Sequence, residues 1–335
     1  MTNVPQTGGD FRSAAAITAI GSYVPESRLT NDDLSRLVDT NDEWIVRRTG
    51  IRERRVAGKD EYASDLAVRA VRDLLDRYPT RTEDIDGILV ATTTPDTPFP
   101  SVAARVQMAF GMPAALAFDM NAACAGFVSA LQTAGGLLLT GAYRKILVIG
   151  VETLTKITDY ADRSTCILFG DGAATVLVER AEKGSFLASY AETNGAGGIH
   201  VYASGLSDRW NGETLEGGGN IVQNGREVYK WAVSTVPGGV RRLLTSADLS
   251  INDLDWFVPH SANLRMIEAM CERLDFPYER ALHSATWYGN TSSASIPLAL
   301  DLAVRDGRLS AGQLLALYGF GSGLVQAGLL LRWTL

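Results

Sequence analysis

The feature that most constrains the fold is an internal repeat, because the second half of the chain restates the pattern of the first. The segment Thr82–Thr92, TEDIDGILVAT, has a counterpart in Ser250–His260, SINDLDWFVPH. Repetition on this scale predicts two similar halves packed about a pseudo-twofold axis. We expect an N-terminal half over residues 1–182 and a C-terminal half over residues 183–335. Three further counterparts follow in the same order: 124–141 with 293–305, 146–149 with 314–318, and 175–179 with 327–332.

Both halves alternate short apolar runs with longer helical patterns, which indicates an α/β fold built in layers. Helices are expected over 30–38, over 264–274, and from a Ser64 N-cap to Tyr78. Residues 1–12 are polar and are expected to be disordered. The strands expected in the chain are 14–21, 86–92, 115–120, 145–150, 173–178, 255–258, 314–318 and 327–332.

Cys124 lies where the short apolar strand over 115–120 meets the long helical pattern over 124–141, which carries no charged residue. A helix that is apolar all round is buried. Its free N–H groups and its dipole place positive potential at its start, and this lowers the pKa of a thiol there. Cys124 is therefore a candidate nucleophile with a lowered pKa. The alternative is a small buried cysteine that packs like alanine.

The charge balance limits the partners of the chain. A net charge of -7 and a pI near 5.1 argue against general binding of nucleic acids or of anionic membranes. The uncharged stretch over 120–143 approaches the length of a membrane span. Its polar residues and its flanking strands favour a buried central helix instead. We see no signal peptide at the N-terminus and expect no membrane association.

The three cysteines are unevenly spaced and form no CxxC pair, so neither a disulfide framework nor a zinc site is indicated. A reducing cytoplasm fits this pattern. Cys166 and Cys271 lie in apolar patterns typical of core packing. His200 and His283 lie in no motif, and we expect structural or surface roles for them.

Three features of the second half complement Cys124. His260 follows the apolar strand over 255–258, and Asn290 lies in a loop of small residues before the next helix. The turn over 318–323, YGFGSG, can direct backbone N–H groups at a reacting oxygen. A thiol, an imidazole and an amide at strand ends supply a nucleophile, a base or hydrogen-bond donor, and an orienting donor. A protease could use the same residue types.

Five motifs occur in order along the chain: NDEWIV with RTGIR over 41–52, ACAGF over 123–127, FGDGA over 169–173, PHSANLR over 259–265 and YGNTSS over 288–293. Together they resemble the motifs of β-ketoacyl-acyl-carrier-protein synthase III, the initiating condensing enzyme of bacterial fatty acid synthesis. The likeness runs from about residue 14 to the end of the chain. It implies the thiolase fold with an αβαβα core, a homodimer, and a catalytic triad of Cys124, His260 and Asn290.

The resemblance also implies binding residues and substrates. These are acyl-CoA and malonyl-acyl-carrier protein, with no metal or redox cofactor. Phe99 would reach the partner's acyl pocket, and the N–H groups of Cys124 and Ser322 would form an oxyanion hole. Ser322 departs from the family's usual Gly-Gly-Gly turn, which puts the local conformation in question. The implied coenzyme A contacts are Trp44, Arg48, Thr49, Arg163 and Asn263, and the implied carrier-protein contacts are Ser261, Ala262, Asn263, Leu264, Arg265 and Lys230.

The residues themselves also suggest an acidic partner. Arg265 lies in the first turn of its helix, where a cation opposes the helix dipole, so recognition is a better reason for it than stability. With Arg226, Lys230 and Arg273 it could form a basic patch, although Arg226 and Lys230 could simply be solvated helix charges.

Alternative functions remain open at this point. A related acyltransferase or a polyketide-type condensing enzyme acting on another acceptor could keep the same triad. A degradative thiolase is disfavoured because enzymes of that class carry a Cys-His-Cys site, and an elongating synthase is disfavoured because it uses a second histidine where Asn290 stands. A catalytically silent subunit is a further alternative, against which the complete triad argues.

Overall fold

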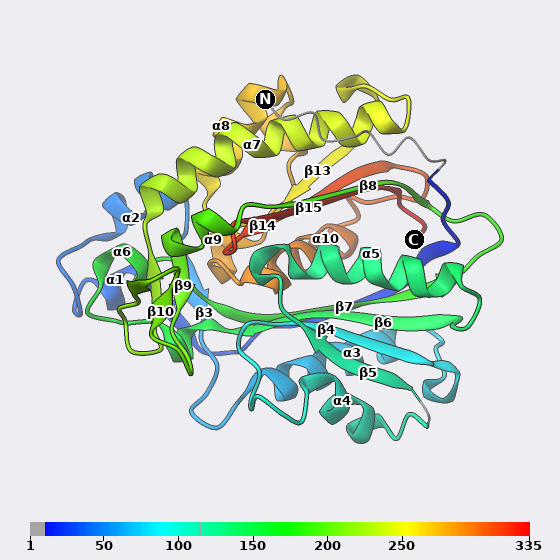
Figure 1. Cartoon of the computed structure of the whole chain (residues 1–335), viewed down its shortest axis with the longest axis horizontal. Helices are drawn as coiled ribbons and strands as arrows, with labels where there is room; N and C mark the ends of the chain where they lie inside the picture. The colour runs from blue at the N-terminus through cyan, green and yellow to red at the C-terminus, as the bar shows by residue number, and fades with distance from the viewer. Residues whose placement is uncertain (1–10, 114) are drawn as a thin grey trace.

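The computed structural model of the protein describes residues 11–113 and 115–335. The disorder expected for residues 1–12 lies almost wholly outside the described part. The described chain forms two main sheets with helices between them and on both outer faces, and three further sheets of two strands each (Figure 1).

The first sheet has the strand order β1-β7-β6-β4-β5. β1 and β7 are antiparallel, as are β7 and β6, whereas β4 runs parallel to both β6 and β5. The edge strand β5 leads into the Cys124 turn. The bounds are β1 Ala15–Tyr23, β4 Gly87–Ala91, β5 Leu116–Met120, β6 Lys145–Thr153 and β7 Asp171–Arg180.

The second sheet repeats this order as β8-β15-β14-β13. β8 and β15 are antiparallel, as are β15 and β14, and β14 and β13 are parallel. Where the first sheet has β5, the second has a single parallel bridge between Phe257 and Ala281. The two halves therefore share one topology and differ at this edge. The bounds are β8 Phe186–Thr193, β13 Trp256–Pro259, β14 Leu314–Gly321 and β15 Val325–Arg332.

Five layers result, with α5 and α10 enclosed between the two sheets (Figure 1). α3 and α4 cover the outer face of the first sheet, and α7 and α8 cover that of the second. This α/β architecture is the thiolase fold that was expected. The bounds are α3 Ala63–Arg77, α4 Val102–Phe110, α5 Gly126–Leu139, α7 Gly225–Ser246, α8 Leu264–Leu274 and α10 Ser295–Arg305.

The enclosed position of α5 explains why its sequence has no charge. Phe127, Val128 and Leu131 are fully buried and pack in the core between the sheets. No helix in the described ranges is long and apolar enough to cross a bilayer. This confirms the prediction that the uncharged stretch forms a buried central helix and not a membrane-spanning one.

Both central helices begin later than their sequences suggested. The helix expected from Cys124 starts with the 3₁₀ turn η2 (Ala123–Ala125) before α5, and the helix expected from Ser293 starts with η7 (Ser292–Ala294) before α10. Each turn opens on a residue with φ of 45°, Ala123 in one and Ser292 in the other. Two non-glycine residues thus adopt the left-handed region at matching places in the repeat.

Two local predictions were wrong. Ser64 does not cap α3, because Tyr62 is the N-cap residue and its N–H donates to the Asp65 carboxylate at 2.9 Å. The Ser64 hydroxyl instead donates to Asp96 at 2.6 Å. The helix expected over 30–38 is the single turn α1 (Asn31–Leu34), with Thr30 as its N-cap.

Candidate active site

Cys124 lies in η2, between the carboxyl end of β5 and the start of α5, and is half-buried. The carboxyl end of β14, at Gly321, passes directly beside it. A Cβ atom on Gly321 would lie 3.0 Å from the Cys124 Sγ, so glycine is required for this close approach. The strand, the helix and the turn together hold the thiol at the bottom of a cavity.

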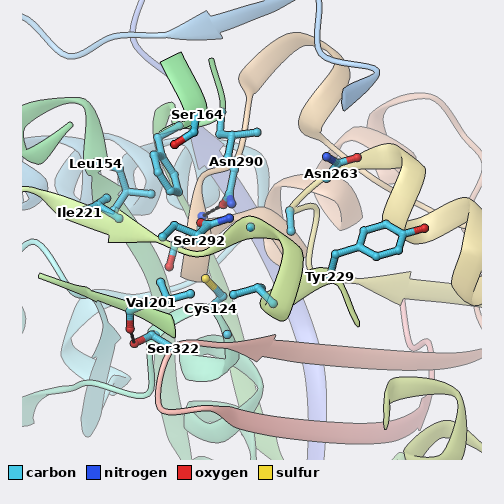
Figure 2. A pocket seen from close by; sticks show the side chains of 18 of the residues that line it. Cys124, Leu154, Ser164, Val201, Ile221, Tyr229, Asn263, Asn290, Ser292 and Ser322 are labelled. Carbon is cyan, nitrogen blue, oxygen red and sulfur yellow. Dashed lines mark hydrogen bonds between the residues drawn. The ribbon is translucent and has the colours of Figure 1, made fainter. Parts of the chain in front are cut away.

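The cavity measures about 1060 Å³ and is lined from both halves of the chain. Cys124 comes from the first half, and His260, Asn290 and Ser322 come from the second. Figure 2 shows Cys124, Asn290, Ser292 and Ser322 around the same space. The structure therefore brings the predicted triad and the predicted oxyanion turn together at one site.

His260 follows β13 and is only 1% exposed. Its Nδ1 lies 2.7 Å from the Ser295 Oγ, and its ring packs edge-on against Phe320 with centroids 5.3 Å apart. Burial lowers the pKa of His260 to about 3, although the backbone of Ser292 opposes this shift. The imidazole is therefore neutral at neutral pH, so it can donate one hydrogen bond but is a poor base.

Asn290 is held by its backbone and by its own side chain. Its N–H donates to the Leu168 carbonyl at 2.8 Å, and its carbonyl accepts from the Gly170 N–H at 3.0 Å. Its Oδ1 accepts the Ser292 N–H at 2.9 Å. Because this bond identifies the oxygen of the side-chain amide, the NH₂ group is the part left to face the cavity.

The lowered pKa expected for Cys124 is contradicted by its surroundings. Burial raises the pKa of the Cys124 thiol to about 12, and the Glu152 carboxylate raises it further. The Ser292 hydroxyl and the backbone at Cys124 act in the opposite direction, but they do not overcome burial. The thiol is therefore protonated in the resting site. The N-terminus of the helix does not keep it ionised as a thiolate.

The predicted coenzyme A residues Trp44, Arg48, Thr49, Arg163 and Asn263 all line the same cavity. The Arg163 guanidinium lies 5.1 Å from the Trp44 ring centroid, which forms a flat cationic and aromatic wall. Thr49 differs from the others, because it is 1% exposed and its hydroxyl donates to the Ile45 carbonyl at 2.7 Å. Its role as a contact to coenzyme A stays a prediction that this internal bond weakens.

The predicted carrier-protein contacts separate into surface and buried residues. Arg265 and Ala262 line the cavity, and Lys230 is exposed on α7. Ser261 is completely buried, and its hydroxyl accepts the Ser284 N–H at 3.1 Å. Ser261 cannot touch a carrier protein in this arrangement, so that contact needs correction. Leu264 is also buried, at 6% exposed.

Arg265 is held toward its own chain. Its guanidinium lies 2.5 Å from the Glu268 carboxylate and 3.3 Å from the Val46 carbonyl. An acidic partner would have to compete with Glu268 for this cation.

Phe99 does not line the cavity of its own chain. It is 85% exposed on the loop before α4. Its contact with a partner's acyl pocket stays a prediction.

Several residues of the site were missed by the sequence reasoning. Ser295 contacts the imidazole, Phe320 packs against it, and Glu152 and Ser292 influence the thiol. The serine-rich run after Asn290 and the internal repeat could have suggested Ser292 and Ser295. The burial of Cys166 and Cys271 is confirmed, at 1% and 2% exposed.

Comparisons with known proteins agree with this geometry. The family model for 3-oxoacyl-[acyl-carrier-protein] synthase III matches residues 118–195, and the model for its C-terminal part matches residues 244–333. β-Ketoacyl-[acyl-carrier-protein] synthase III 2 of Halalkalibacterium halodurans is 57% identical over 323 residues, which cover 96% of this chain and 97% of that protein. The Bacillus subtilis protein of the same name is 57% identical, over 96% of this chain and 99% of its own length.

A comparison with solved structures points to the same family. The solved structure of a β-ketoacyl-[acyl-carrier-protein] synthase III from Thermus thermophilus superimposes with a TM-score of 0.92 at 45% identity, over 95% of this chain and 99% of that one. These similarities extend over nearly the whole chain. The chain therefore belongs to the β-ketoacyl-[acyl-carrier-protein] synthase III family.

Proposed function

We propose that this enzyme condenses a short acyl-CoA primer with malonyl-acyl-carrier protein, with loss of carbon dioxide, to give a 3-oxoacyl-carrier protein that initiates fatty acid synthesis. The observation that carries the proposal is the convergence of Cys124, His260 and Asn290 on one cavity. Membership of the family supports the same acyl-transferring reaction.

In the first step the Cys124 sulfur attacks the primer thioester. The S–H bond and the bond from the acyl carbon to coenzyme A break, the acyl group joins Cys124, and coenzyme A leaves with the proton as a thiol. The N–H groups of Cys124 and Ser322 hold the developing oxyanion. The Ser322 hydroxyl is already engaged, because it donates to the Val201 carbonyl at 2.5 Å.

In the second step malonyl-carrier protein replaces coenzyme A. The carbon–carbon bond to the carboxylate breaks, and negative charge grows on the thioester oxygen. The neutral imidazole of His260 and the NH₂ of Asn290 donate hydrogen bonds to that oxygen. The enolate carbon then attacks the acyl group on Cys124, the bond from the acyl carbon to the sulfur breaks, and the cysteine leaves as a thiolate that takes a proton from solvent. No metal or redox cofactor enters this scheme.

We also propose that the two halves of the chain, which meet at residue 182, supply different groups to the site. This boundary falls in the connection between β7, which ends at Arg180, and β8, which begins at Phe186. Residues 1–182 would supply the nucleophile, and residues 183–335 would supply the hydrogen-bond donors and the oxyanion turn.

The proposed assembly is a cytoplasmic homodimer. The exposed Phe99 and the edge strand β5 both lie on the first half, where a second copy could cover them. Light scattering should report a dimer for the intact protein, and a monomer at working concentration would count against this part of the proposal.

A polyketide-type priming reaction is the second candidate. A solved priming β-ketosynthase from the R1128 polyketide pathway is 35% identical, with a TM-score of 0.90 over 98% of this chain and 99% of that one. The closer similarity to the synthases of Bacillus and its relatives favours the fatty acid reaction.

The deciding experiment is mass spectrometry of the enzyme after exposure to a mixture of acyl-CoAs, followed by addition of malonyl-carrier protein. We expect a single acyl adduct on Cys124 that disappears as a 3-oxoacyl-carrier protein forms. An adduct that persists with malonyl-carrier protein but transfers to another acceptor would favour the second candidate.

The carrier-protein contact has its own test in Arg265→Glu. We expect the malonyl-carrier step to weaken by an amount on the order of 1 to 5 kcal/mol, while acyl-CoA loading stays nearly intact. Equal loss in both steps would instead indicate misfolding or a coenzyme A role for Arg265.

A further inference from the structure

The Nδ1 side of the His260 ring meets one side chain. The Ser295 Oγ lies 2.7 Å from Nδ1 and also accepts the Ser261 N–H at 3.3 Å. Ser295 is the first residue of α10 and is completely buried. A buried hydroxyl hydrogen without an acceptor destabilises the folded protein, so the direction of this hydrogen bond matters.

The position of each hydrogen follows from the contacts. Among the hydrogen bonds of the described residues, Nδ1 is the one acceptor within reach of the Ser295 hydroxyl hydrogen. If the hydroxyl donates to Nδ1, the ring hydrogen must lie on Nε2.

We propose that Ser295 is a positioning residue that holds His260 in the tautomer with its hydrogen on Nε2. This inference rests on the proposed function, in which His260 acts as a donor to the malonyl thioester oxygen. The opposite tautomer would present a lone pair to that oxygen and repel the charge that grows there. Ser295 therefore makes His260 competent for loss of carbon dioxide without touching the substrate.

The chain is well suited to a direct test, because it contains three histidines, His200, His260 and His283. Nitrogen-15 NMR of the full-length enzyme labelled at histidine distinguishes a ring nitrogen that carries a hydrogen from one that does not. We expect the wild-type His260 signals to show a single neutral tautomer, with the hydrogen on Nε2, between pH 5 and pH 8. The His260→Ala variant assigns these signals by their disappearance.

Ser295→Ala should change the tautomer and the chemistry together. We expect averaged or exchanged nitrogen signals for His260, release of carbon dioxide about tenfold slower, and acyl-CoA loading within about threefold of wild type. The expected loss is smaller than for removal of a donor from an oxyanion site, since the imidazole remains. Ser295→Thr keeps the hydroxyl and should restore the Nε2 hydrogen.

Ser284→Ala is the matched control. The Ser284 hydroxyl is also buried and donates to the Ser295 carbonyl at 3.1 Å, but it does not contact the imidazole. We expect this variant to match wild type in both measurements. A hydrogen on Nδ1 in the wild-type enzyme, or an unchanged His260 spectrum in Ser295→Ala, would overturn the inference. Failure of the wild-type enzyme to load acyl-CoA would count against the proposed function alone, since the spectrum does not depend on turnover.

Discussion

The turn at Cys124 and the turn at Ser293 are two copies of one structure with different chemistry. Each is a 3₁₀ turn that opens on a residue with φ of 45° and leads into a central helix. Each is crossed by a strand glycine. A Cβ on Gly319 would lie 3.0 Å from the Cys124 carbonyl oxygen, and a Cβ on Gly150 would lie 2.5 Å from the Ser293 carbonyl oxygen.

The difference appears two residues beyond each glycine. Gly321 has no side chain, which lets the strand approach the Cys124 thiol closely, and both residues line the cavity. Glu152 occupies the equivalent place beside Ser293, and its carboxylate accepts the Ser293 hydroxyl at 3.0 Å. It also accepts hydrogen bonds from the hydroxyls of Thr93 and Thr94, both at 2.8 Å.

The comparison shows that the backbone alone does not make a nucleophile. The Ser293 turn has the same backbone shape, but its hydroxyl is buried and bonded within the chain. The Cys124 thiol, whose neighbour on the crossing strand is a glycine, lies instead at the cavity. The following predictions test that comparison, from the largest expected effect to the smallest.

Cys124→Ala should abolish the acyl-enzyme completely. The Ser293 turn cannot substitute for it, because a buried and hydrogen-bonded hydroxyl does not reach the substrate. Mass spectrometry of peptides after incubation with acyl-CoA measures this. An acyl group on Ser293 or on Cys271 in the variant would break the comparison.

His260→Ala should slow release of carbon dioxide by about 100-fold to 1000-fold, because one donor to the thioester oxygen is lost. Acyl-CoA loading should survive at a reduced rate, since an imidazole with a pKa of about 3 is a poor base at neutral pH. Radiolabelled acyl transfer and carbon dioxide release should be measured on the same preparation. Loading that collapses as far as decarboxylation would show that His260 is an obligatory base.

Gly321→Ala should make the Cys124 turn resemble the Ser293 turn. The added Cβ would lie 3.0 Å from the sulfur, and a shift of about 1 Å in a reacting group can cost about 100-fold in rate. We expect acyl-CoA loading to fall by that order while the fold persists. Gly136→Ala on α5 is the control, since a Cβ atom added there meets no atom within 4 Å. Equal loss in both variants would mean that the close approach of Gly321 to the thiol is not what matters.

The pH dependence of Cys124 alkylation should show its raised pKa. Because the pKa is about 12, the thiolate fraction grows about tenfold per pH unit from pH 6 to pH 9. The rate with iodoacetamide should rise in the same proportion, without a plateau. A plateau near pH 7 would restore the helix-dipole explanation.

Glu152→Gln should give the smallest effect, a shift of the same alkylation profile toward lower pH. Glu152 opposes the thiolate by charge, but burial is the larger cause of the raised pKa. We expect the rate at any one pH to rise by less than about tenfold. Asp301→Asn, which changes a buried carboxylate paired with Arg77 and Arg305, should leave the profile unchanged.

The sequence predicted the layered α/β halves because these rest on regular patterns, whereas the grouping of Cys124, His260 and Asn290 at one site followed from the resemblance to a family. The segments with strand or helix periodicity form the strands and helices of the two sheets and their layers. The motifs around Cys124, His260 and Asn290 are short stretches that can be recognised in the sequence. The thiol pKa could not be predicted, because it depends on how many atoms from other segments surround the sulfur. Ser261 was misplaced for a similar reason, since a position in a surface motif does not reveal that one side chain turns inward.

The hydrogen bond from Ser322 to the Val201 carbonyl has a consequence for how the enzyme discriminates between acyl primers. Val201 belongs to the cavity wall, so this bond couples the wall to the turn that we propose holds the oxyanion (Figure 2). A primer too wide for the wall would displace the turn along with it. The enzyme would then discriminate between primers mainly through the speed of thioester attack, and only secondarily through how tightly each primer is held.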